Sequence, residues 1–200
     1  MSEPAARTAT VTRNTAETKI AASVNLDGAG ACEVNTGIGM LDHLISQLAR
    51  HGLFDLTVTC EGDLHIDAHH TTEDCGIALG KAFDQALGDR AGIVRMAHAI
   101  VPLDETLSLV AIDLSGRGYA VLDMPFSTPM IGTLPTELIP HFLETFAREA
   151  RLNLHVQVLR GANSHHKAEA TFKALARALD QATQFDPRRG GSIPSTKGTL

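Results

Sequence analysis

The chain of 200 residues contains no apolar run of the roughly 20 residues that a membrane span requires. Its first residues, MSEPAARTATVTRNT, lack the apolar core of a secretory signal peptide. Basic residues are few, 17 against 23 acidic ones for a net charge of −6, which argues against non-specific nucleic-acid binding. No long low-complexity block is present, and the apolar content of 44% is ordinary for a folded protein. We therefore expect a soluble, cytoplasmic protein without membrane or nucleic-acid partners.

Cysteine is scarce as well, and histidine is not. The three cysteines, Cys32, Cys60 and Cys75, form no CxxC spacing, which favours reduced thiols and offers no thiolate metal site. Ten residues are histidine, and four of these form two adjacent pairs. The histidines are therefore the first candidates for chemistry.

The chain repeats one pattern twice. Strand-like residues from Arg7 to Leu26 end in a glycine-containing turn, and so does the stretch from Asp104 to Leu114. Without gaps, Glu17 aligns with Glu105. A helical pattern, an alternating strand and a second helical pattern follow in each case. The sequence thus predicts an α+β fold, an internal duplication of a strands–helix–strand–helix unit with helices covering one face of each sheet.

The repeat also divides the chain. We expect a first half over residues 1–92 and a second half over residues 93–185. The remaining residues, 186–200, are rich in glycine, proline and serine and are expected to form an extended tail.

Each half carries the motif His-His-x-x-Glu at the start of a predicted helix. Its residues are His69, His70 and Glu73 in the first half, and His165, His166 and Glu169 in the second. On a helix the glutamate stays near the side of both histidines. Adjacent histidines diverge by about 100°, so each pair is better suited to two different metal ions than to one. Helix capping explains neither the doubled histidines nor their repetition.

The preceding helix of each half adds one histidine, His43 or His141, at a matching place on its polar face. With the motifs, these residues would furnish four protein ligands to each of two metal ions. Imidazole with a carboxylate suits Mn, Fe, Ni or Zn and favours a catalytic ion over a closed structural zinc site. We expect three other histidines to be solvated: His65, His98 and His155.

Isolated basic residues at turns indicate an anion site. Arg117 lies in a Ser-Gly-Arg-Gly turn, whose glycines let the backbone approach a ligand, and Arg95 opens a strand of the second half. Ser195 and Lys197 in the tail add a hydroxyl and an ammonium group. Such a set suits a phosphate monoester.

Four segments together resemble the imidazoleglycerol-phosphate dehydratase family: Gly37–His43, Asp67–Asp74, Ser164–Glu169 and Ser195–Gly198. The resemblance runs from about Arg13 to Gly198. It implies a fold like domain 2 of ribosomal protein S5, and a lyase that dehydrates imidazole glycerol phosphate to imidazole acetol phosphate in histidine biosynthesis.

The resemblance further implies two Mn²⁺ ions per active site, held by the eight histidines and glutamates named above. It places four residues at the substrate phosphate: Arg95, Arg117, Ser195 and Lys197. It also implies self-assembly into a large homo-oligomer, a cubic 24-mer with active sites shared between subunits.

The reaction so implied removes a proton from a carbon that is beside no carbonyl. An ordinary carboxylate base is badly matched to such a proton. If both nitrogens of the substrate ring bind metals, the ring becomes an imidazolate that can expel the hydroxyl on the attached carbon. The segment Arg13–Glu17 matches a family pattern and makes Glu17 the favoured residue near the reacting hydroxyls. Further catalytic candidates are Glu73, Glu169, His51 and Asp104, with Glu105 and Lys173 as lesser ones for proton transfer; Gln47 and Lys173 are candidates for substrate binding.

Two other functions stay open on the residues alone. A metal-dependent hydrolase would use a dinuclear His/Glu site to activate water. A metal storage or sensing protein would bind the ions without turnover, but it has no obvious use for the anion site. A ferritin-like bundle is excluded, because its E-x-x-H order is reversed here and strands have no place in it.

Overall fold

The computed structural model describes residues 6–200. In the first half lie the strands β1 (Thr8–Asn14), β2 (Thr18–Asn25), β3 (Cys32–Asn35) and β4 (Asp55–Gly62) and the helices α1 (Gly39–Gly52) and α2 (His69–Leu87). In the second half lie β5 (Met96–Leu103), β6 (Thr106–Asp113), β7 (Tyr119–Asp123) and β10 (Asn153–Arg160), with α3 (Leu138–Glu149) and α4 (Ser164–Thr183). A short hairpin of β8 (Met130–Ile131) and β9 (Leu134–Pro135) precedes α3, and a 3-10 turn, Pro187–Arg189, follows α4.

The two halves have the same sheet topology. The strand order is β1-β2-β4-β3 in the first sheet and β5-β6-β10-β7 in the second. In each sheet three strands are antiparallel, and the last, β3 or β7, runs parallel to its neighbour. This equivalence confirms the α+β fold and the duplication that the sequence predicts.

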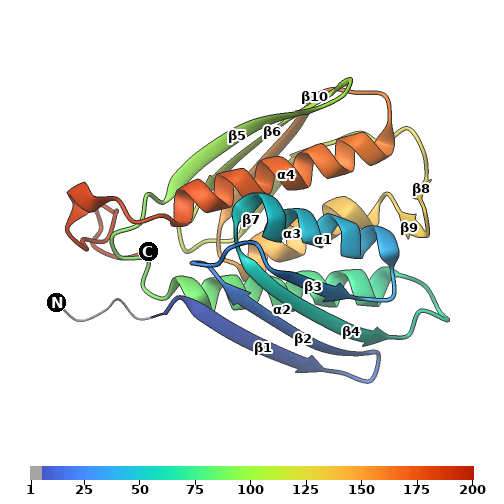
Figure 1. Cartoon of the computed structure of the whole chain (residues 1–200), viewed down its shortest axis with the longest axis horizontal. Coiled ribbons are helices and arrows are strands. Elements are labelled where there is room, and N and C mark those ends of the chain that lie inside the picture. The colour runs from blue at the N-terminus through green and yellow to red at the C-terminus, as the bar shows by residue number, and fades with distance from the viewer. Residues whose placement is uncertain (1–5) are drawn as a thin grey trace.

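All four helices lie between the two sheets (Figure 1). α2 packs on β1 and β2, and α4 packs on β5 and β6. Two helix pairs cross between the halves: α1 packs along α4, and α2 packs along α3. Each sheet therefore has one face covered by helices, and the halves share one hydrophobic core.

Aromatic side chains join the helices within this core. The rings of Phe83 on α2 and Phe146 on α3 lie 5.4 Å apart, and those of Phe142 on α3 and Phe172 on α4 lie 5.6 Å apart. All four side chains are fully buried. Contacts of this kind contribute roughly 0.5–1.5 kcal/mol each beyond the area that they bury.

Two glycines on α2 let α3 approach closely. A β-carbon at Gly80 would lie 2.8 Å from the carbonyl oxygen of Phe146, and one at Gly76 would lie 3.1 Å from that of Phe142. Any side chain at position 80 would push the two helices apart. The close approach matters for the site, because His141 on α3 faces α2.

Arg90 ties the two halves together from inside the protein. Only 2% of this residue is exposed. Its guanidinium donates to the carbonyl oxygens of Leu114, Ala150 and Arg151 at 3.0–3.3 Å and to the carboxylate of Asp84. The charge is therefore satisfied on every side by groups from both halves.

Replacing Arg90 with methionine should destabilise the protein by about 3 kcal/mol, because three carbonyls and a carboxylate lose their donor. For a chain of this length that loss lowers the melting temperature by about 6–12 °C. Thermal unfolding of the metal-free protein measures it. Arg151→Met is the matched control, since the Arg151 side chain is 53% exposed; equal shifts in the two variants would contradict the role given to Arg90.

None of the helices in the described part of the chain combines the length and apolar character needed to cross a bilayer.

Candidate metal centre and anion pocket

The four helices begin at the same end of the molecule, where the β8–β9 hairpin lies (Figure 1). Their first two turns carry the predicted histidines and glutamates. Because α1 packs on α4 and α2 packs on α3, residues from different halves meet there. Two groups of three result.

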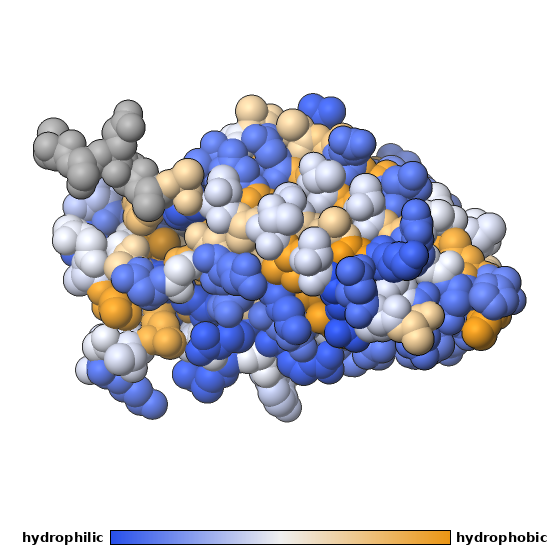
Figure 2. Space-filling model, turned by 90° about the horizontal axis from the view of Figure 1, so that it is seen from below, coloured by the Kyte–Doolittle hydropathy of each residue, from blue (hydrophilic) through white to orange (hydrophobic). Residues whose placement is uncertain are grey.

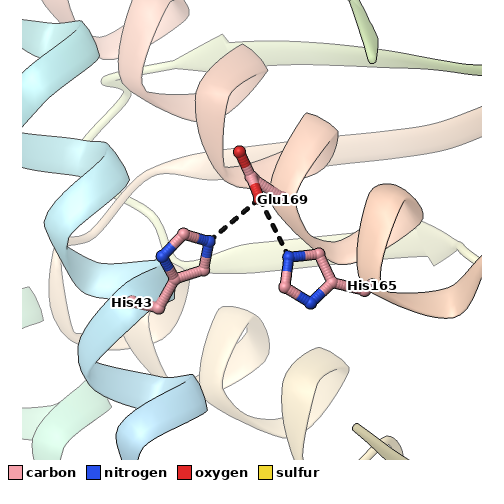
Figure 3. Close-up of side chains that lie close together, drawn as sticks. All are labelled: His43, His165 and Glu169. Atoms are coloured by element: carbon pink, nitrogen blue, oxygen red, sulfur yellow. Dashed lines mark hydrogen bonds and ion pairs between the residues drawn. The ribbon is translucent and has the colours of Figure 1, made fainter. Parts of the chain in front are cut away.

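The first group, which we call the α1–α4 triad, consists of His43, His165 and Glu169. Glu169 Oε2 lies 2.9 Å from His43 Nε2 and 3.0 Å from His165 Nε2 (Figure 3). Figure 3 shows both imidazoles directed at this one oxygen. Two nitrogens and one carboxylate oxygen thus converge, an arrangement that fits a divalent transition-metal ion.

The second group, the α2–α3 triad, consists of His69, Glu73 and His141. Its candidate ligand atoms lie within 4.8 Å of one another. The rings of His69 and His141 are 4.7 Å apart, and His141 Nε2 lies 3.6 Å from Glu73 Oε1. His141 Nε2 is buried and forms no hydrogen bond with any described residue. A buried nitrogen directed at a carboxylate without a hydrogen bond fits a metal ligand.

Each triad therefore combines residues of both halves. His43 on α1 joins His165 and Glu169 of the second half, and His141 on α3 joins His69 and Glu73 of the first half. The sequence left this partition open. It led us to expect four protein ligands for each ion, whereas a single chain brings three together in each triad. His70 and His166 belong to neither group.

His70 and His166 diverge from their neighbours as the helix geometry predicts. Ring planes within the two pairs are inclined at 85° and 86°, with centroids 6.0 and 6.3 Å apart. His70 Nδ1 lies 3.0 Å from Asp63 Oδ2, and His166 Nδ1 lies 2.7 Å from Glu105 Oε2. These hydrogen bonds raise the pKa of both imidazoles.

Glu17 lies at the turn between β1 and β2, with its carboxylate 3.7 Å from His70 Nε2 and 52% of its side chain exposed. The pattern Arg13–Glu17 explains this placement. Thr15 Oγ1 accepts hydrogen bonds from the backbone N–H groups of Glu17 and Thr18 and so shapes the turn. Arg13 Nε lies 3.0 Å from the carboxylate of Asp74 on α2, which fixes the turn beside the motif helix.

Lys173 lies one turn after Glu169 on α4, and its Nζ is 2.5 Å from Glu169 Oε1. Burial raises the pKa of Glu169, but hydrogen bonds from Lys173, His43 and His165 outweigh burial and lower that pKa to about 2. Lys173 thus acts on a triad carboxylate. It keeps that carboxylate ionised, as a metal ligand must be.

Three other candidates lie near the histidines: Gln47 and His51 on α1, and Asp104 in the turn between β5 and β6. The Gln47 amide donates to the backbone carbonyl of His43 at 3.1 Å. Burial, followed by the charge of Lys173, lowers the pKa of His51. Asp104 is 76% exposed, with a carboxylate oxygen 3.8 Å from His166 Nε2. The three histidines expected to be solvated, His65, His98 and His155, are exposed.

The four residues predicted to bind phosphate line a single pocket of about 650 Å³: Arg95, Arg117, Ser195 and Lys197. Arg95 connects the tail to the second sheet, because it donates to the carboxylate of Asp113 at 2.7 and 3.0 Å and to the carbonyl of Pro194 at 2.5 Å. Arg189 also lines the pocket, so four cationic side chains surround it.

The anion pocket and the triads lie at opposite ends of the folded molecule (Figure 1). The backbone N–H of Arg95 donates to the carbonyl of Ala182 near the end of α4, whereas His165 lies in the first turn of the same helix. At 1.5 Å per residue, the helix separates the two positions by about 25 Å.

Three residues of the site gave no signal in the sequence. Asp63 belongs to the loop before α2, and its contact with His70 depends on the course of that loop. Asp113 has no motif around it, and its role follows from pairing with Arg95. Arg189 reaches the pocket only because the tail folds back on the strand that Arg95 opens.

Fold and site together define a duplicated α+β enzyme with a candidate two-metal centre and a separate cationic pocket. A family model described as imidazoleglycerol-phosphate dehydratase matches residues 36–179. The imidazoleglycerol-phosphate dehydratase of Dehalococcoides mccartyi is 61% identical over 97% of this chain and 97% of its own. That of Chloroflexus aggregans is 58% identical over 98% of this chain and 95% of its own.

Solved structures agree with these relatives. The crystal structure of imidazoleglycerol-phosphate dehydratase from Staphylococcus aureus has 34% identity and a TM-score of 0.81, and the match covers 90% of this chain and 99% of that one. The structure of IGPD from Pyrococcus furiosus has 33% identity and the same TM-score, over 95% of this chain and all of that one. The chain belongs to the imidazoleglycerol-phosphate dehydratase family, as its motifs indicated, and is a hydro-lyase.

Proposed function

We propose that this protein removes water from imidazole glycerol phosphate to give imidazole acetol phosphate, in histidine biosynthesis. The observation that carries the proposal is the pair of His/Glu triads, which would hold the two Mn²⁺ ions expected for each site. The names of the relatives support the substrate. The cationic pocket supports a phosphorylated one.

The two triads, with His70 and His166, would hold the metal ions. Bound there, the ions would supply Lewis acidity to the imidazole ring of the substrate, which would favour its imidazolate form and so the loss of the neighbouring hydroxyl. Lys173 holds Glu169 ionised for this role. Arg95, Arg117, Ser195 and Lys197, the last two from the tail over residues 186–200, would bind the phosphate.

Glu17 is the residue that we propose for proton transfer at the reacting hydroxyls. Its carboxylate is half exposed and lies 3.7 Å from His70 Nε2, beside the motif histidines. Thr15 holds the turn that carries it. Gln47 and His51 share a face of α1 with His43, and Asp104 lies beside His166; these are the further candidates to contact substrate.

A complete site would need more than one chain. The glycerol backbone of the substrate joins ring and phosphate through three carbons, which cannot bridge about 25 Å. We propose that the triads of one chain meet the anion pocket of another in a homo-oligomer, of the 24 chains that the family resemblance implies.

The outer faces of the two sheets support self-assembly, because they differ although the sheets are duplicates. The face of the first sheet is polar, with Thr8, Thr10 and Thr12 exposed on β1, and Figure 2 shows this side as mostly blue and white with scattered orange. The face of the second sheet exposes Ile100, Val121 and Leu159 at 42–52%. Apolar side chains exposed on a sheet face can be covered by a partner chain in an assembly.

Metal removal and restoration test the proposed function. Protein stripped with a chelator should lose dehydration of imidazole glycerol phosphate, because its ligands remain but the Lewis acid does not. Titration with Mn²⁺ should restore turnover and saturate at two ions per chain. Stripped protein that keeps its turnover would refute the proposal, and hydrolysis of phosphate esters without dehydration would favour the hydrolase.

A further inference from the structure

The two histidines outside the triads share one feature, a carboxylate held against Nδ1. A carboxylate only accepts hydrogen bonds, so the Nδ1 of a neutral imidazole beside it must carry the proton. The lone pair is then on Nε2. In both residues Nε2 points away from the carboxylate that contacts Nδ1. It faces Glu17 in His70 and Asp104 in His166.

Glu105, which contacts His166 Nδ1, is itself held by backbone N–H groups. Glu105 Oε1 accepts from the N–H groups of Ala162 at 3.1 Å and Asn163 at 2.9 Å, just before α4. Glu105 Oε2 is left for His166 Nδ1, at 2.7 Å. The two oxygens therefore have different and fixed partners.

Asp63, which contacts His70 Nδ1, is held differently. Asp63 Oδ2 lies 3.0 Å from His70 Nδ1, whereas Asp63 Oδ1 is buried and has no hydrogen-bond partner among the described residues. The repeat partner of Glu105 is Glu17, which contacts no Nδ1. The two glutamates at equivalent repeat positions therefore have different contacts: Glu105 contacts His166 Nδ1, whereas Asp63 and not Glu17 contacts His70 Nδ1.

We propose that Glu105 and Asp63 are positioning residues, which fix the Nδ1–H tautomer of His166 and His70 so that each presents an Nε2 lone pair to a metal ion. The inference rests on the proposed function, since it takes these two histidines as ligands. Carboxylates in this position orient ligating histidines in many metal sites.

Glu105→Gln provides a sharp test, because only one orientation of the amide satisfies the backbone. The amide oxygen must face the two N–H groups of Ala162 and Asn163, which places the NH₂ group against His166 Nδ1. An NH₂ group donates, so Nδ1 must accept and the proton moves to Nε2. We expect Mn²⁺ affinity at the site that uses His166 to fall about 10- to 100-fold.

Two variants serve as controls. Glu33→Gln is the same substitution at an exposed glutamate on β3, outside both triads, and should leave Mn²⁺ affinity unchanged. Asp63→Asn should have a smaller effect than Glu105→Gln, because its amide is free to rotate and keep an oxygen against His70 Nδ1. Isothermal titration of chelator-stripped protein with Mn²⁺ compares all three with the wild type.

The tautomer itself is measured without metal. Solid-state NMR of the ¹⁵N-histidine-labelled, stripped protein distinguishes protonated from unprotonated ring nitrogens, and His166→Gln assigns the relevant signals. Wild-type His166 should show an unprotonated Nε2, and Glu105→Gln should reverse the pattern. A protonated Nε2 in the neutral wild-type ring, or equal Mn²⁺ affinities in wild type and Glu105→Gln, would overturn the inference; a wild type that binds no Mn²⁺ would instead refute the proposed function.

Discussion

Glu169→Gln should lower kcat/KM for dehydration about a thousandfold, a loss of several kcal/mol in transition-state stabilisation. Glu169 is the only acidic member of its triad, and one of its oxygens faces both histidine nitrogens. A neutral amide keeps the volume of the side chain but lacks the charge that balances a divalent ion. The ion of this triad would therefore be lost or displaced.

The same variant should bind one Mn²⁺ ion per chain where the wild type binds two. Metal content after gel filtration measures this directly, alongside initial rates at saturating Mn²⁺. Glu144→Gln is the matched control, since Glu144 is exposed on α3, one turn after His141. Activity within a few-fold of wild type in Glu169→Gln would show that the α1–α4 triad holds no catalytic ion.

Residue spacing within short segments was enough to predict the helices and the placement of the His-His-x-x-Glu motifs on them. Leu41, Leu44, Ile45 and Leu48 recur at helical spacing, and all four are buried on α1. The His-His-x-x-Glu motifs begin helices, so the divergence of each histidine pair followed from 3.6 residues per turn. These features depend on neighbours in the chain, which is why a single sequence was sufficient.

The grouping of ligands could not be predicted in this way. Which histidine joins which motif depends on α1 crossing to α4, and no residue spacing encodes a contact between halves. Thr145 illustrates the limit: its hydroxyl suggests a polar helix face beside His141, yet it is buried against Gly76 because α3 packs closely on α2. The separation of triads and pocket likewise became visible only once α4 was placed between them.

Mixing two inactive variants should restore activity if the active site is shared. Glu169→Gln breaks a triad and leaves the anion pocket intact, whereas Arg117→Ala weakens the pocket and leaves the triads intact. A site that takes its triads from an Arg117→Ala chain and its pocket from a Glu169→Gln chain has every group it needs. In oligomers assembled from equal amounts, about a quarter of the sites meet this condition by random mixing.

Co-expression with two different tags, followed by purification on both, isolates the mixed oligomers for assay. Recovered turnover far above the sum of the two variants supports sites formed between chains. A mixture of Glu169→Gln with His165→Ala should recover nothing, because both changes damage the same triad and no chain supplies it intact. Should the first mixture stay as inactive as this control, each site must be built by one chain, which the distance of about 25 Å along α4 does not allow; the positions assigned to the substrate ring or to its phosphate would then be wrong.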